Sequence, residues 1–297
     1  MNSLPPYLEQ ALLSQYGPYV DQISVGYSAR RPTTLRVNTL KASMEGVTEA
    51  LRAQGIAYQP VGWYADAMVL PTMSESEVLS LSICTQGEVY LQGLTAMLPP
   101  LGMSFPRGCS VLDMCAAPGG KTAQIAALTQ STVSITACEK DRFRCERLRH
   151  NLKQQGVHNV TVLQTDSRHL DPAFRFDRIL LDAPCSGSGT LCLQDAPRRM
   201  EQQWVQKLKS TQIHLLEKGL SLLSSGGELV YSTCSILREE NEEVLQMVLP
   251  RFHAETVPLP DELTAAMPKL PVVVPNTLCV CPTPLYEGFF VAKIVKA

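Results

Sequence analysis

The sequence predicts an α/β protein whose main domain is a doubly wound, mainly parallel sheet of seven strands. From Cys109 onward, short apolar strands alternate with helical segments, which is the pattern of parallel strands joined by right-handed crossovers. Hydrophobic residues make up 45% of the chain and charged residues 18%, a composition typical of a globular protein that buries a large core. In such sheets ligands bind beyond the carboxyl ends of the strands, so we expect the functional residues there.

The seven expected strands are short apolar runs bounded by turn or helix signals. They lie at residues 110–114, 133–138, 160–163, 178–181 and 228–232, with two late strands at 254–257 and 289–294. The chain has 297 residues, which exceeds the usual size of one domain. We therefore expect a companion domain at residues 1–92 in front of a main domain at residues 93–297.

The companion domain is expected to be a small α/β unit preceded by helical turns. Apolar residues with helical spacing occur at Leu8, Leu12 and Leu13, and residues 34–39 have the pattern of a strand. Ser43 is a candidate cap for a helix that presents Met44, Val47 and Leu51 on one face and ends at Gly55, and a strand pair is expected near Tyr58 and Met68.

Several classes of protein are disfavoured by what the sequence lacks. No signal-like segment opens the chain, and no apolar run approaches the roughly 18 residues of a membrane span, so we expect a cytoplasmic protein with no membrane partner. The ten cysteines are expected to be free thiols, and Cys279-x-Cys281 is too weak a pattern for a metal site. With a net charge of -2, nucleic acid could be held only by local basic patches.

Polar residues follow four successive strands of the predicted sheet. The first strand runs into Asp113-Met114-Cys115-Ala116-Ala117-Pro118-Gly119-Gly120-Lys121-Thr122, where small residues let a ligand approach the backbone and the next helix. This loop is neither a dinucleotide fingerprint nor a P-loop. The next three strands end at Glu139, Asp166 and Asp182, and acids are poor strand residues that are costly to bury. Together these residues predict a cleft for a ribose, an adenine amine and a polar substrate.

Two cysteines follow neighbouring strands at the same expected edge. Cys185 follows Asp182-Ala183-Pro184, and Cys234 follows Tyr231-Ser232-Thr233. Thiols at such an edge can be activated and exposed to substrate, whereas Cys84, Cys109, Cys138 and Cys145 are expected to be small buried hydrophobes. The pair is therefore the candidate for nucleophilic chemistry.

These motifs, in this order, resemble the NOP/Sun family of RNA cytosine-5 methyltransferases. The matching segments are residues 115–121, 182–187, 231–234 and 288–292, and residues 36–41 and 87–92 resemble the family's preceding domain. The resemblance implies a Rossmann-like class I methyltransferase with an RRM-like N-terminal domain, acting on RNA, with ribosomal RNA favoured over transfer RNA. It implies that Cys234 attacks the base, that Cys185 and Asp182 assist, and that S-adenosylmethionine is held by Cys115, Ala116, Ala117, Pro118, Gly119, Gly120, Lys121, Glu139, Asp166 and Asp182.

RNA contacts are expected from Arg36, Asn38 and Lys41, although a plain amphipathic edge strand explains that segment equally well, and from Arg198 and Arg199 after the Pro-Cys loop. The chain departs from the family pattern at Cys192-Leu193 and at residues 278–281, where the family carries basic residues. We expect a monomer without a metal.

Two alternatives remain open at this stage. The first is a DNA cytosine-5 methyltransferase in which Cys185 attacks, against which the Thr233-Cys234 motif argues. The second is a non-catalytic RNA-binding factor that keeps the fold.

Overall fold

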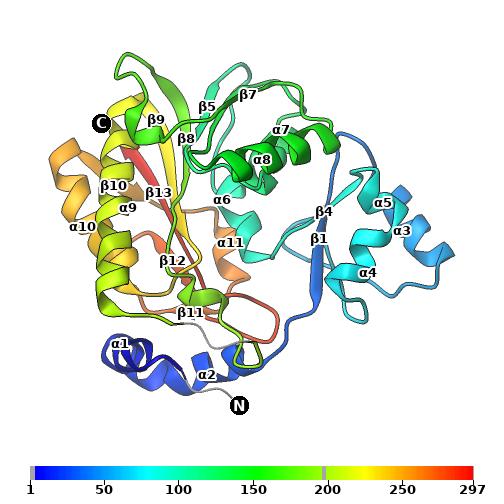
Figure 1. Cartoon of the computed structure of the whole chain (residues 1–297), viewed down its shortest axis with the longest axis horizontal. Coiled ribbons are helices and arrows are strands. Elements are labelled where there is room, and N and C mark those ends of the chain that lie inside the picture. The colour runs from blue at the N-terminus through cyan, green and yellow to red at the C-terminus, as the bar shows by residue number, and fades with distance from the viewer. Residues whose placement is uncertain (1–3, 196–198, 297) are drawn as a thin grey trace.

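The computed structural model describes residues 4–195 and 199–296. Figure 1 shows a larger unit built on one sheet and a smaller α/β unit beside it. The strands of the large sheet are β5 (Ser110–Asp113), β6 (Ser134–Cys138), β7 (Val160–Leu163), β8 (Phe176–Asp182), β9 (Leu223–Thr233), β10 (Ala254–Val257), β11 (Lys269–Leu270), β12 (Thr277–Val280) and β13 (Phe289–Lys296).

The large sheet has nine strands, in the order β11-β12-β13-β9-β8-β5-β6-β7, with β10 paired to β13. The five strands from β7 to β9 are parallel, and β13 runs antiparallel to β9. All seven predicted strands are present, but the predicted number was two too small. The missed strands β11 and β12 are two and four residues long, and three of the four β12 residues are buried, so neither shows the alternation by which a strand is recognised.

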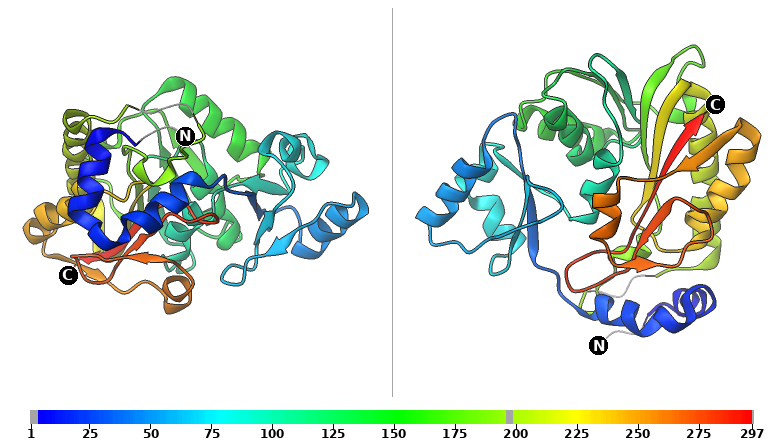
Figure 2. Two further views of the ribbon diagram at one scale, coloured as in Figure 1. Left: turned by 90° about the horizontal axis from the view of Figure 1, so that it is seen from below. Right: turned by 180° about the vertical axis from the view of Figure 1, so that it is seen from behind.

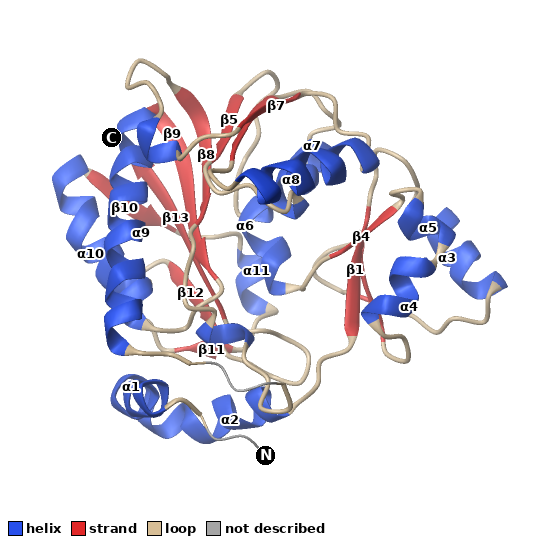
Figure 3. Ribbon diagram, in the orientation of Figure 1, coloured by secondary structure: helices blue, strands red, loops and turns tan. Residues whose placement is uncertain are grey.

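Helices cover both faces of this sheet, as Figure 3 shows with the strands in red. One face carries α9 (Gln202–Leu222) and α10 (Glu242–Val248), and the other carries α6 (Leu98–Leu101), α7 (Gly120–Leu128), α8 (Arg142–Gln154) and α11 (Asp261–Ala265). Successive strand residues point to opposite faces. Thus Leu112 and Ile179 belong to the core under α9, while Val111 and Leu180 belong to the core under α7. Burial on both faces explains the continuous apolar runs of these strands.

The smaller unit is a four-stranded antiparallel sheet in the order β2-β3-β1-β4. Its elements are β1 (Thr33–Val37), α3 (Met44–Ala53), β2 (Gln59–Pro60), β3 (Ala67–Leu70), α4 (Glu75–Ser80), α5 (Ser82–Thr85) and β4 (Val89–Leu91). The side chain of Ser43 accepts a hydrogen bond from the Gly46 backbone N–H at 3.1 Å, so the predicted helix cap is confirmed. The strand pair expected near Tyr58 and Met68 is confirmed as β2 and β3.

The first two helices, α1 (Pro6–Tyr16) and α2 (Val20–Ser28), pack with the large sheet and not with the smaller unit. Figure 2 shows them beneath the larger unit in the view from behind and in front of it in the view from below. The hydroxyl of Tyr16 donates to the carbonyl of Ile236 at 2.6 Å, and that of Tyr27 donates to the carbonyl of Ser188 at 2.7 Å. The helical entry thus supports the loops that follow β8 and β9, although it precedes the smaller unit in sequence.

All ten cysteines are free thiols, as predicted. Among residues 4–195 and 199–296, no helix is long and apolar enough to cross a membrane. In the same part of the chain, no group of three or more His, Cys, Asp or Glu side chains is arranged to hold a metal ion.

Candidate active site

A cavity of about 340 Å³ opens at the carboxyl ends of the parallel strands. It brings together the acids predicted at three strand ends, Glu139, Asp166 and Asp182, with both predicted cysteines, Cys185 and Cys234. These residues come from five segments spread over about a third of the chain, and they meet because parallel strands end at a common edge. The structure therefore assembles the acids and thiols in one place.

A second cavity of about 220 Å³ adjoins the first, since both are lined by Cys115, Ala117 and Asp182. One wall comes from the smaller unit, where Tyr90 and Gln92 at the end of β4 line it. Neither was singled out from the sequence. The signal available was their place at the end of a short strand, just before a glycine, Gly93.

The loop after β5 needs glycine for two different reasons. Gly119 has a φ of 109°, a left-handed conformation that side chains disfavour. A Cβ on Gly120 would lie 2.8 Å from the ring of Tyr90, so the close approach of the smaller unit requires the missing side chain. The predicted cofactor loop thus leads directly into the N-terminus of α7, whose backbone N–H groups face the cavity end of the sheet.

Asp182 is held from two sides at the floor of both cavities. Lys121 Nζ lies 2.7 Å from its Oδ2, and the Ser232 hydroxyl donates to its Oδ1 at 2.8 Å. Burial opposes the charge of Lys121, but the attraction of Asp182 outweighs it and raises the pKa of the ammonium group. Lys121 therefore keeps its charge, and the side chain of Asp182 is fixed in orientation.

The two acids at the ends of β6 and β7 are held by arginines. Arg168 binds Asp166 through Nε and Nη2, at 3.0 and 2.6 Å from Oδ1 and Oδ2, and this hydrogen bonding lowers the pKa of Asp166 to about 2. Glu139 accepts the backbone N–H of Asp141 at 2.9 Å and lies 3.5 Å from Arg144 Nη2. Each carboxylate keeps lone pairs for a ligand.

Asp113, at the end of β5, is a further acid in the smaller cavity. Its Oδ2 accepts the Thr122 hydroxyl at 2.7 Å, while its buried Oδ1 has no hydrogen-bond partner. Burial raises the pKa of Asp113 to about 6. A buried acceptor without a partner is uncommon and marks this point of the cavity as a place for a donor from a ligand.

The sulfur atoms of Cys185 and Cys234 lie 3.2 Å apart. The hydrogen bond to Cys234, reinforced by burial, raises the pKa of the Cys185 thiol well above its usual value. Cys185 therefore keeps its proton at neutral pH, and its thiol lies in direct hydrogen-bond contact with the sulfur of Cys234.

The loops that carry these cysteines are packed against the start of β13. A Cβ on Gly189 would lie 2.0 Å from the carbonyl oxygen of Gly288, and the backbone N–H of Gly288 donates to the carbonyl of Gly189 at 2.8 Å. The glycine that opens the segment at 288–292 therefore has a packing role beside the Pro-Cys loop.

The predicted RNA contacts divide into buried and exposed residues. Arg36 and Asn38 are 0% and 1% exposed. Arg36 donates to Gln92 Oε1 at 3.1 Å, and Asn38 donates to the carbonyls of Gly87 and Gln155 at 2.8 Å. They join the smaller unit to the large one, and an RNA strand cannot reach them there. The sequence pattern of residues 36–41 is the same for a strand at an open sheet edge and for a strand buried between the two units, so it did not predict this burial.

The other predicted RNA contacts lie at the surface where they are described. Lys41 donates to the carbonyl of Gln86 at 2.8 Å, and Arg199 is exposed. Arg198 lies outside the described residues.

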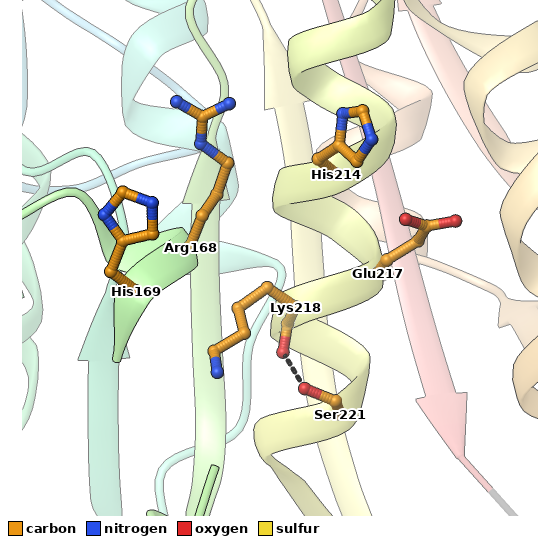
Figure 4. A pocket seen from close by; sticks show the side chains of 6 residues that line it. All are labelled: Arg168, His169, His214, Glu217, Lys218 and Ser221. Carbon is orange, nitrogen blue, oxygen red and sulfur yellow. Dashed lines mark hydrogen bonds between the residues drawn. The ribbon is translucent and has the colours of Figure 1, made fainter. Parts of the chain in front are cut away.

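A separate hollow lies between α9 and the 3₁₀ turn η3 (Ser167–His169). Figure 4 shows Arg168 and His169 facing α9, from which His214, Glu217, Lys218 and Ser221 project. Its charged groups already have partners: Arg168 binds Asp166, Glu217 pairs with Arg251, and Lys218 donates to the carbonyl of Leu170. We therefore place the candidate site at the strand ends.

Comparison with known proteins agrees with this architecture. A family model described as 16S rRNA methyltransferase RsmB/F matches residues 105–295. A second model, described as the ferredoxin-like domain of RsmF/B-like methyltransferases, matches residues 4–75.

Similar proteins include two curated relatives and a solved structure. The chain is 36% identical over 279 residues to ribosomal RNA small subunit methyltransferase F of Cronobacter sakazakii, covering 89% of this chain and 56% of that protein. It is 36% identical over 235 residues to 26S rRNA (cytosine-C(5))-methyltransferase nsun-1 of Caenorhabditis elegans, covering 77% of this chain and 35% of that protein. The crystal structure of a methyltransferase homolog protein from Pyrococcus horikoshii has a TM-score of 0.81 at 34% identity and covers 99% of this chain and 100% of that chain.

The chain spans about half the length of the curated relatives that it matches. The match of the catalytic-domain model nonetheless extends over well more than half of the chain, and the ferredoxin-like model covers the region in front of it. The resemblance recognised in the sequence is confirmed, and the chain belongs to the family described as 16S rRNA methyltransferase RsmB/F.

Proposed function

We propose that the protein transfers a methyl group from S-adenosylmethionine to carbon 5 of a cytosine in RNA, with Cys234 as the nucleophile. The observation that carries the proposal is the pair of cysteine sulfurs, 3.2 Å apart, in a cavity lined by three strand-end acids. A methyltransferase that acts only by holding the methyl donor and the acceptor close together needs no pair of thiols in its active site.

The residues at the strand ends suit S-adenosylmethionine, which carries an ammonium group and a sulfonium centre. Asp113 offers a buried oxygen without a partner to the ammonium group, and Glu139 and Asp166 offer carboxylates to the ribose hydroxyls and the adenine. When bound, S-adenosylmethionine supplies an electrophilic methyl group. Tyr90 and Gly120 line the smaller cavity next to Asp113.

Cofactor affinity should depend on pH through Asp113. Its pKa of about 6 lies above the ordinary value, so the carboxyl is neutral below pH 6 and charged above it, and only the charged form attracts an ammonium group. Because apparent affinity scales with the competent fraction, it should rise about tenfold from pH 5 to pH 7. Calorimetry with S-adenosylhomocysteine measures this. Asp113→Asn should bind weakly at both values, and an unchanged pH slope in that variant would remove Asp113 from the site.

Carbon 5 of cytosine is a poor nucleophile until a thiolate adds to carbon 6 and moves electron density to it. The Cys234 sulfur forms that bond, and the Cys185 thiol lies beside it at 3.2 Å. Asp182, oriented by Lys121 and Ser232, accepts from the exocyclic amine of the activated ring or, when it carries a proton, donates to nitrogen 3, where negative charge develops. Carbon 5 then carries both a methyl group and a hydrogen.

Release of the product requires two bonds to break. The hydrogen on carbon 5 leaves as a proton, and the electrons of that bond re-form the ring double bond as the bond between Cys234 sulfur and carbon 6 breaks. We assign Cys185, whose sulfur lies 3.2 Å from that of Cys234, the relay of this proton: its thiol protonates the departing Cys234 sulfur and takes up the proton from carbon 5. The base must be unstacked to be attacked, which favours single-stranded RNA.

Ribosomal RNA is the proposed substrate because relatives at 36% identity carry rRNA methyltransferase names. Incubation of the purified chain with S-adenosylmethionine and rRNA fragments, followed by bisulfite sequencing, should reveal one protected cytosine. The same position should lose protection in RNA from a deletion strain. Methylation of a DNA duplex in place of RNA would favour the alternative in which Cys185 attacks, and cofactor binding without transfer to any nucleic acid would favour a non-catalytic RNA-binding factor.

A further inference from the structure

Two consecutive buried residues connect the loops that carry the two cysteines. Glu240 ends the 3₁₀ turn η5 (Arg238–Glu240), Asn241 precedes α10, and both are 0% exposed. We propose that Glu240 and Asn241 are positioning residues that clamp the Cys185 loop to the Cys234 loop and so set the distance between the two sulfurs. The proposal deepens the proposed function and rests on it for its meaning in catalysis.

Glu240 holds the residues on both sides of Cys185. Its Oε1 accepts the backbone N–H of Ser186 at 2.8 Å, and its Oε2 accepts the Ser186 hydroxyl at 2.5 Å. Gln212 Nε2 donates to Glu240 Oε1 at 3.1 Å and to the carbonyl of Pro184 at 2.9 Å. The carboxylate therefore fixes the Cys185 loop directly on one side and through Gln212 on the other.

Asn241 holds the residues on both sides of Cys234. Its Oδ1 accepts the Thr233 hydroxyl at 2.6 Å, and its Nδ2 donates to the carbonyl of Ser235 at 2.9 Å. The hydroxyls of Ser235 and Ser188 lie 2.8 Å apart and join the two loops a second time. Since residues 240 and 241 share one peptide bond, neither loop can move without the other.

The chemistry of Glu240 argues against a role in packing alone. Burying a carboxylate is costly, and within the described residues no lysine or arginine forms a salt bridge with it, since the nearby Lys209 pairs with Glu243. Three donors from two residues satisfy it instead. The hydrogen bond to Cys234 and burial raise the pKa of the Cys185 thiol most, and the negative charge of Glu240 adds to that shift.

The sulfur-to-sulfur contact itself provides a test that does not depend on methyl transfer. Diamide oxidises two adjacent thiols to a disulfide and is reduced to the hydrazine, and peptide mapping by mass spectrometry measures how fast the Cys185–Cys234 disulfide forms. Glu240→Ala and Asn241→Ala should slow this reaction at least tenfold. Glu240→Gln should restore most of the rate, because its amide can accept from the Ser186 N–H and donate to the Ser186 hydroxyl.

Glu242→Gln is the matched control, because Glu242 is equally buried but interacts with Cys279 and Tyr16 instead of the cysteine loops. It should keep the wild-type rate.

Circular dichroism and cofactor calorimetry identify variants that fold. If Glu240→Ala does not fold, Ser186→Ala removes one of the three hydrogen bonds to Glu240, the one from the Ser186 hydroxyl to Oε2, and should also slow the reaction. Folded variants that all oxidise at the wild-type rate, or a wild-type chain that never forms this disulfide, would overturn the clamp.

Kinetics on RNA separate this proposal from the proposed function. Because a displacement of about 1 Å can cost about 100-fold in rate, Glu240→Ala should lower kcat about 100-fold with little change in KM for the cofactor. A chain that methylates no RNA but shows the predicted oxidation rates keeps the clamp and loses the function. A chain that methylates RNA while every clamp variant oxidises and turns over normally keeps the function and loses the clamp.

Discussion

Cys234→Ala is expected to abolish methyl transfer and to form no adduct with RNA, because no other group then raises the electron density at carbon 5. Cys185→Ala is expected to attack the base and then stall. The Cys234 sulfur remains, but the thiol 3.2 Å away that relays the proton is gone. A covalent protein–RNA complex that survives denaturing electrophoresis should therefore accumulate with Cys185→Ala and be absent with Cys234→Ala.

The effect should be at least a thousandfold on turnover for Cys234→Ala, as for other residues that act as a catalytic unit. Cys192→Ala is the control, since Cys192 is a free thiol that lines neither cavity at the strand ends. It should turn over normally and trap nothing. The opposite pattern, with a trapped complex from Cys234→Ala and none from Cys185→Ala, would move the nucleophile to the end of β8 and support the DNA-type alternative.

Gly189→Ala is expected to give the largest loss of stability of any single methyl addition near the site. The added carbon would lie 2.0, 2.4 and 2.8 Å from three backbone atoms of Gly288, and backbone on both sides cannot yield as a flexible side chain can. We expect the free energy of unfolding to fall by about 3 kcal/mol or more, the upper range for overpacking. Urea denaturation followed by circular dichroism measures the change.

Gly62→Ala is the reference for this substitution, because a Cβ on Gly62 would have no atom within 4 Å. Its unfolding midpoint should stay within experimental error of wild type. If Gly189→Ala is as stable as Gly62→Ala, the loop after Cys185 is not packed against Gly288 as the structure describes, and the position of Cys185 must be revised with it.

Much of the large unit could be predicted from the sequence, because its determinants are local or periodic. Apolar runs of four to six residues separated by helical segments defined the parallel strands, and each was found where it was expected. Once the strands were assigned, Asp182, Cys185 and Cys234 had to lie near one another, since the carboxyl ends of neighbouring parallel strands share an edge. The sequence alone therefore predicted that thiols and acids meet at that edge of the sheet.

Only the tertiary structure revealed contacts between segments that are far apart in sequence. Arg36 has the same local pattern whether its strand is an open edge or a buried junction, and it was the packing of α7 and Gln92 that buried it. Likewise β12 forms a strand because β13 offers it an edge to pair with, and β11 forms one because it pairs with β12.

The same distinction applies to the residues that hold the site. Glu240 and Ser186 are 54 residues apart, and no spacing rule relates a buried carboxylate to a loop at that distance. The sequence by itself determined which side chains can react, because reactivity belongs to residue type and strand position. Their separation and protonation were decided by burial and by hydrogen bonds that exist only after the chain has folded.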